Sequence, residues 1–273
     1  MKSYYALIIE SAEVLKKQLD KVPEIVVVLG TGLGALADQV SDKISIPYTD
    51  IPNFPASTVK GHQGTLIFGT MHHKNVLMMM GRFHHYEGYT MKELVFPFYV
   101  FKQLGVKTVI LTNACGAINP SYLPGDIIII DDFINLVMQN PLIGINDERL
   151  GPRFPDMTEP YSNELIALAK KCSKGIIDHV EQGVYGFFSG PYFETRAEIR
   201  AYGRMGCDLI GMSTVPETIA LNHMGLKVLA FGVVTNMATG ISNRKHDHLA
   251  VIEIANQAST KLMAWIDEII RQS

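Results

Sequence analysis

The sequence predicts an α/β fold built on a largely parallel or mixed β-sheet, and two features of its pattern support this prediction. Short runs of β-branched and aliphatic residues recur along the chain, each with the length of a buried strand: 24–29, 106–111, 126–130 and 227–235. Helical stretches lie between them, and two of these begin with a threonine three residues before a glutamate, at Thr90 and Thr195, which is the spacing of a capping box.

The remaining elements are consistent with one domain over residues 1–273. Residues 4–19 place apolar side chains at helical spacing, which predicts an amphipathic helix, and a long helix is expected over 248–271. With 47% hydrophobic residues in 273, the chain is long enough to bury a large core. No repeat or low-complexity linker divides the chain. Residues 121–160 are long enough to form a functional loop.

Composition and charge exclude several classes of protein. The formal net charge of −3 lacks the basic excess that extended nucleic-acid binding needs, so we expect a small ligand and no nucleic acid. The odd number and wide spacing of Cys115, Cys172 and Cys207 argue against a disulfide framework and a zinc cluster. No apolar run is long enough for a signal peptide or a membrane span. We expect a cytoplasmic protein without a membrane partner.

A glycine-rich loop follows the first predicted strand. In Gly30–Ala35 (GTGLGA) the backbone N–H groups can face an anion, and Thr31 adds a hydroxyl donor. The loop also fits a loose dinucleotide-binding pattern, with Asp50 about twenty residues further on. Asp50 lies in a loop-like stretch between prolines, so the dinucleotide interpretation is the weaker one. A third alternative is that the glycines serve only a tight turn.

Residues 81–89 (GRFHHYEGY) follow another strand-like run and are dense in functional groups. Arg82 offers a guanidinium suited to a phosphate or carboxylate, and His84 and Tyr86 can point to the same side. The histidines leave a metal site open, although they lack a nearby acid or cysteine at ligand spacing. The alternative is a surface pair between Arg82 and Glu87, with the aromatic rings packed.

Two further loops are expected to contribute backbone or acidic groups. In 112–117 small residues allow a ligand to approach the Ala114 N–H, and Cys115 is either a nucleophile or, as we favour, a buried inert thiol. Glu194 stands just before the helix that begins at Thr195. A helix N-terminus favours an ionised carboxylate, so Glu194 is expected to accept hydrogen bonds from ligand N–H groups or merely to complement the helix dipole.

These loops follow different strands, and ligand sites of α/β sheets gather at the carboxyl ends of strands. Two later junctions add Ser213 and Asn236. Donors for one phosphate-sized anion come from Thr31, Arg82, His84, the Ala114 N–H and Ser213. An amide-reading pair for a polar heterocycle comes from Glu194 and Asn236, with Phe193 and Met212 on its apolar faces. The sequence thus predicts a phosphate and a nucleobase in one pocket.

The chain resembles the trimeric, low-molecular-mass type of purine nucleoside phosphorylase in the nucleoside phosphorylase superfamily. The resemblance covers nearly the whole chain, in the motifs at 30–34, 51–55, 61–62, 81–89, 112–116, 146–149, 193–198, 211–217 and 235–236. It implies a single nucleoside phosphorylase domain, with a mixed, partly barrel-like sheet flanked by helices. It also implies a cytoplasmic homotrimer of purine salvage that needs no metal or organic cofactor.

The implied reaction is the reversible phosphorolysis of 6-oxopurine (2′-deoxy)ribonucleosides, such as inosine and guanosine, to free purine and (2-deoxy)ribose 1-phosphate. The implied phosphate site comprises Thr31, His62, Arg82, His84, Ala114 and Ser213. The implied ribose contacts are Tyr86, Met212, His248 and, from a neighbouring subunit, Phe154. The implied base contacts are Phe193, Glu194 and Asn236, and the implied catalytic residues are Asn236, Glu194 and His84. His246 is the alternative to His248 as partner of the 5′-hydroxyl.

Two other functions remain open. A methylthioadenosine phosphorylase, which acts on a 6-amino base, usually has Asp where this chain has Asn236. A noncatalytic nucleoside-binding protein explains the pocket but does not require Arg82, His84 and Ser213 together. The Glu194 and Asn236 pair therefore favours phosphorolysis of inosine and guanosine.

Overall fold

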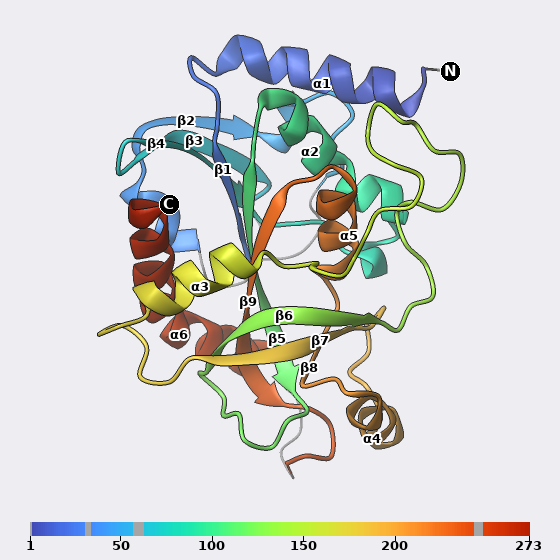
Figure 1. Cartoon of the computed structure of the whole chain (residues 1–273), viewed down its shortest axis with the longest axis vertical. Coiled ribbons are helices and arrows are strands. Elements are labelled where there is room, and N and C mark those ends of the chain that lie inside the picture. Colours follow the sequence, from blue (N-terminus) through green and yellow to red (C-terminus); the bar gives the residue numbers. More distant parts are fainter. Residues whose placement is uncertain (1, 31–33, 57–62, 243–247) are drawn as a thin grey trace.

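The structure is a computed structural model that describes residues 2–30, 34–56, 63–242 and 248–273. One nine-stranded sheet is flanked by helices (Figure 1), which confirms the α/β fold. The strands are β1 Ile25–Leu29, β2 Ser41–Pro47, β3 Thr65–Met71, β4 Lys74–Met80, β5 Thr108–Ala117, β6 Ile127–Asn135, β7 Glu181–Phe187, β8 Leu209–Gly211 and β9 Lys227–Met237. The α-helices are α1 Tyr4–Gln18, α2 Met91–Leu104, α3 Asn163–Cys172, α4 Arg196–Met205, α5 Val215–His223 and α6 His248–Gln272. Short 3₁₀ segments are η1 Gly34–Gln39, η2 Tyr48–Asp50 and η3 His85–Glu87.

The sheet is mixed, and part of it closes on itself. The strand order is β2-β3-β4-β1-β5-β8-β7-β6-β9, and β9 also pairs with β5. The strands from β5 to β9 therefore form a closed ring, whereas β1 to β4 extend it as an open sheet. Parallel pairing of β5 with β1 and with β9 places three adjacent strands in one direction, so their carboxyl ends meet at one edge. The mixed, partly barrel-like sheet is confirmed.

Strands β5 and β9 are longer than the sequence predicts. We expected a loop at 112–117 and the end of a strand at 235, and both expectations were wrong, because β5 continues to Ala117 and β9 to Met237, side by side. Asn113 pairs with Gly232 and Ala114 with Val233, and the register shifts between Cys115 and Gly116. Polar and small residues in this stretch have low strand propensity, but the hydrogen-bonded partner strand overrides it. The ligand-facing groups of β5 and β9 thus lie on strands that are hydrogen-bonded to each other.

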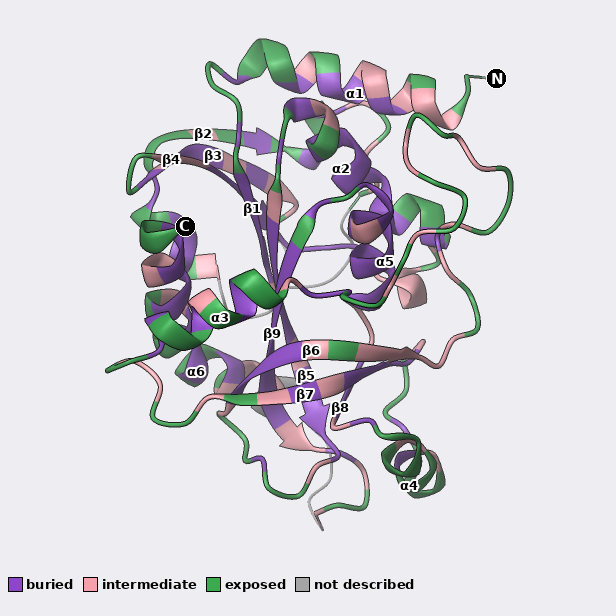
Figure 2. Cartoon of the chain, viewed as in Figure 1, coloured by how far each residue is buried: buried purple, intermediate pink, exposed green. Residues whose placement is uncertain are grey.

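The helices that the sequence predicts form close to their expected positions. The capping boxes at Thr90 and Thr195 both form and open α2 and α4. Helix α1 buries Ile8 and Leu15, as its amphipathic spacing requires, and α6 spans His248–Gln272. In Figure 1, α2 packs with α1 and α5, and α3 packs with α6. Figure 2 shows the central strands buried while α4 is largely exposed.

Helices of the described residues are too short or too polar to cross a lipid bilayer.

Candidate active site

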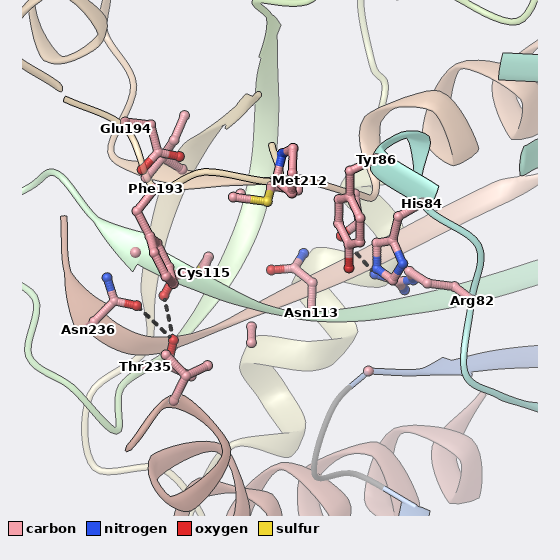
Figure 3. A pocket seen from close by; sticks show the side chains of 18 of the residues that line it. Arg82, His84, Tyr86, Asn113, Cys115, Phe193, Glu194, Met212, Thr235 and Asn236 are labelled. Carbon is pink, nitrogen blue, oxygen red and sulfur yellow. Dashed lines mark hydrogen bonds between the residues drawn. The ribbon is translucent and has the colours of Figure 1, made fainter. Parts of the chain in front are cut away.

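The carboxyl-end region of β5, β8 and β9 borders a cavity of about 620 Å³, within the size range of small-molecule sites. Figure 3 shows Arg82, His84 and Tyr86 at one end of this cavity and Phe193, Glu194 and Asn236 at the other, with Met212 between them. Its lining includes nine residues nominated from the sequence: Arg82, His84, Tyr86, Ala114, Phe193, Glu194, Met212, Ser213 and Asn236. The predicted convergence of these loops on one cavity is therefore observed.

Other nominated residues are not placed in this cavity. Thr31, His62 and His246 lie outside the described residues, and His248 begins α6 with its side chain outside the description. Phe154 is 87% exposed and does not line the cavity of its own chain. Its assignment to a neighbouring subunit's site remains a prediction.

Arg82 is buried at the end of the cavity that also contains His84 and Tyr86 (Figure 3). Its NH1 donates a hydrogen bond of 3.0 Å to Ser213 Oγ, and its Nε lies 3.2 Å from Glu217 Oε1. The side chains of Arg82 and Glu217 are only 3% and 5% exposed. The alternative of a surface pair between Arg82 and Glu87 is wrong in its location, because the two side chains are each only 3% exposed. Gly81, with φ of 101°, turns the chain at the end of β4.

His84 is oriented by Glu87. The Glu87 carboxylate accepts the His84 backbone N–H at 2.8 Å and lies 2.9 Å from His84 Nδ1. The imidazole stacks on the Tyr86 ring with 4.7 Å between centroids, so these two side chains share one side, as predicted. Burial lowers the pKa of His84, and the hydrogen bond to Glu87 partly opposes this. When Nδ1 carries the proton toward Glu87, Nε2 is the unprotonated nitrogen of the neutral imidazole.

Ser213 sits in a strained turn before α5. Thr214 has φ of 72° and ψ of −50°, and the Val215 N–H donates to Ser213 O at 2.8 Å, which makes a tight three-residue turn. Thr214 is fully buried, and its Oγ1 accepts from Asn113 Nδ2 at 2.8 Å. A β-branched residue at positive φ persists only where its surroundings hold it, and such strain gathers at functional sites.

Glu194 lies at the other end of the cavity and is 5% exposed. It precedes the Thr195 cap of α4, as predicted. Burial raises the pKa of the Glu194 carboxyl, which opposes the ionised form that the helix N-terminus favours. A ligand N–H that hydrogen-bonds to the ionised form offsets this desolvation.

Asn236 is held on β9 by its neighbour Thr235. The Thr235 hydroxyl lies 3.0 Å from Asn236 Oδ1 and 3.2 Å from Cys115 O, and it can donate to either. The Cys115 thiol is buried and donates to Val233 O at 3.4 Å, and burial raises its pKa, which agrees with the interpretation as an inert thiol.

Neither the dinucleotide nor the metal alternative gains support. Asp50 is an exposed residue in η2 and does not line the cavity. Within the described ranges, no group of three His, Cys, Asp or Glu side chains is arranged to hold a metal ion.

Sequence and structure comparisons identify the family. The family model described as "Phosphorylase superfamily" matches residues 24–271, and the chain belongs to this superfamily. Purine nucleoside phosphorylase 1 of Geobacillus stearothermophilus is 47% identical over 96% of both chains. The Bos taurus purine nucleoside phosphorylase is 41% identical over 94% of this chain and 91% of the relative.

A solved structure has the same fold. Schistosoma mansoni purine nucleoside phosphorylase in complex with inosine superposes with a TM-score of 0.93 at 40% identity, covering 98% of this chain and 96% of the other. A Schistosoma purine nucleoside phosphorylase in complex with hypoxanthine gives a TM-score of 0.92 at 41% identity.

Proposed function

We propose that this chain is a purine nucleoside phosphorylase that converts inosine or guanosine, or their 2′-deoxy forms, and phosphate into free purine and (2-deoxy)ribose 1-phosphate. One observation supports this most strongly: a single cavity has anion donors at one end and amide-reading groups at the other (Figure 3). Bacterial and mammalian relatives bear the name of this activity. Phosphate is then a co-substrate, and no organic cofactor or metal is needed.

Phosphate is the nucleophile in this proposal. Arg82, Ser213 and the Ala114 N–H hold it beside C1′ of the sugar, with His84 on the same anion. Thr31 and His62 are proposed as further donors. The C1′–N9 bond breaks through a ribosyl group with oxocarbenium character, so the anion stabilises positive charge on the sugar. Positioning of the two reactants lowers the barrier without a covalent enzyme intermediate.

The departing base gains negative charge as the glycosidic bond breaks. Asn236 stabilises it through hydrogen bonds at N7 and the 6-oxo group, which helps protonation of N7. Ionised Glu194 accepts from N1–H and from a 2-amino group where one is present. Phe193 covers one face of the purine. A 6-oxo base fits this pair, because it carries the N1–H that a carboxylate requires.

The sugar lies between these two groups, where Met212 and Tyr86 line the cavity. His248 is proposed as the partner of the 5′-hydroxyl, with His246 as the alternative. Phe154 is proposed to reach the site of a neighbouring subunit, and the resemblance implies that the assembly is a homotrimer. Its exposure of 87% within one chain supports this arrangement, since a large exposed apolar ring is available for a contact between subunits. We place the enzyme in the cytoplasm, in purine salvage.

The test is release of free base from inosine, guanosine and adenosine, with and without phosphate, by the wild type and by Glu194→Gln. We expect hypoxanthine and guanine only when phosphate is present, and a large loss in Glu194→Gln. Glu198→Gln is the matched control, because Glu198 caps the same helix and does not line the cavity. Preferential adenine release favours the methylthioadenosine phosphorylase alternative. Nucleoside binding without turnover leaves a binding protein.

A further inference from the structure

A buried carboxylate that does not line the cavity lies directly behind the anion-binding arginine. Glu217 is the third residue of α5, and its Oε1 is 3.2 Å from Nε of Arg82. Arg82 lines the cavity and Glu217 does not. A substrate anion and Glu217 therefore meet different parts of the same guanidinium.

Burial makes this carboxylate costly to keep for stability alone. Burial raises the pKa of Glu217, and the Arg82 charge opposes the increase. In the described part of the chain, Oε2 of Glu217 has no hydrogen-bond partner. A buried ion pair of this kind often stabilises a fold no better than apolar residues of similar volume. The position of Glu217 beside Arg82 therefore suggests a role in binding through Arg82 rather than in stability alone.

The contacts of Arg82 fix the plane of its guanidinium. Glu217 engages Nε, while NH1 donates to Ser213 Oγ at 3.0 Å and lies 3.4 Å from Thr214 Oγ1. The guanidinium is a rigid planar fork, so contacts at two of its nitrogens determine where the third points. All these partners come from one segment, the turn at 213–215 and the first turn of α5.

We propose that Glu217 is a positioning residue for phosphate: it anchors Nε of Arg82 from behind and thereby holds the terminal nitrogens toward the anion beside Ser213. The inference rests on the proposed function, because it takes phosphate as the ligand of Arg82. It requires the reach of the Glu217 side chain as well as its polar oxygen. An aspartate at this position is one methylene shorter. It keeps the charge, but it either displaces the Arg82 guanidinium toward α5 or no longer contacts Nε.

Two conservative variants separate reach from charge. Glu217→Asp keeps the charge and loses the reach, and Glu217→Gln keeps an acceptor oxygen at the same distance and loses the charge. We expect Glu217→Asp to raise the phosphate KM about tenfold and to leave the inosine KM within about twofold. We expect Glu217→Gln to stay close to the wild type in phosphate KM. Leu221→Ala is the control for a simple loss of stability, because Leu221 is fully buried on the same helix.

The phosphate-induced rise in melting temperature gives a second measurement without turnover, and it should shrink in Glu217→Asp and persist in Glu217→Gln. The reverse order of the two variants means that charge alone matters and overturns the inference. Leu221→Ala should change both KM values equally or change neither. The same behaviour in Glu217→Asp also overturns the inference. If the wild type itself shows no phosphate-dependent base release, the proposed function fails instead. The melting measurement then still reports whether phosphate binds.

Discussion

Replacing Arg82 by methionine tests the electrostatics of the site most severely. The Glu217 side chain is only 5% exposed, and the change removes its ion pair with Arg82. Removal of one partner from a buried ion pair costs about 3–5 kcal/mol. At about 2–4 °C per kcal/mol for chains of 150–250 residues, the melting temperature should fall by about 6–20 °C.

The double variant Arg82→Met with Glu217→Leu separates stability from activity. Because it removes the isolated charge as well, it should recover most of the lost free energy of unfolding. It should remain inactive in phosphorolysis, since the guanidinium that binds phosphate is still missing. Both quantities come from the same preparations, by denaturant unfolding and by phosphate-dependent base release.

The stability deficit of Arg82→Met should also depend on pH. The pKa of Glu217 is already raised by burial, and loss of Arg82 raises it further. A carboxyl whose pKa is raised in the folded state stays protonated to a higher pH in the native protein than in the unfolded chain. The free energy of unfolding therefore falls as the pH rises from 4.5, the ordinary pKa of the group, to its pKa in the folded state. The deficit should thus be full at high pH and shrink on acidification. A loss below about 1 kcal/mol at pH 8, or a double variant less stable than the single one, refutes this reasoning.

Three further outcomes are expected at the substrate end of the site. Burial raises the pKa of Glu194, and the base needs the ionised carboxylate, so the inosine KM should rise as the pH falls. Glu194→Gln should abolish this pH dependence, and a dependence that persists in the variant belongs to another group. Asn236→Asp should raise the adenosine to inosine ratio of kcat/KM by about tenfold or more, since a protonated carboxyl suits a 6-amino base; an unchanged ratio removes Asn236 from specificity. Phe154→Ala should raise the inosine KM, whereas Ile145→Ala, a change at an apolar residue that is 98% exposed on the same loop, should not; equal effects contradict the subunit-bridging role.

The sequence predicts this fold well where local signals agree with the tertiary structure. The capping boxes at Thr90 and Thr195 are local hydrogen-bonding patterns, and both helices begin there. The β-branched run that forms β1 is buried in the sheet. By contrast, the continuation of β5 through Asn113 and Gly116 depends on pairing with β9, more than a hundred residues away. No local pattern indicates that pairing.

The sequence also predicted many of the residues that line the site, but few of the contacts that orient them. The expectation that polar groups gather at strand ends brought together Arg82, Ser213 and Asn236 correctly. The partners that orient them were missed. Glu87 lies three residues after His84, and that spacing was a usable signal. Glu217 gave no such signal, because its contact with Arg82 joins segments 135 residues apart.

The measurement that tests the central claim most directly is the product balance of inosine cleavage, followed by phosphorus NMR together with assay of free hypoxanthine. Our account predicts one ribose 1-phosphate formed and one phosphate consumed for each hypoxanthine released. It also predicts no cleavage when phosphate is omitted. Free ribose as the sugar product, or hypoxanthine release at an equal rate without phosphate, would contradict the assignment of phosphate as the nucleophile held by Arg82, His84 and Ser213.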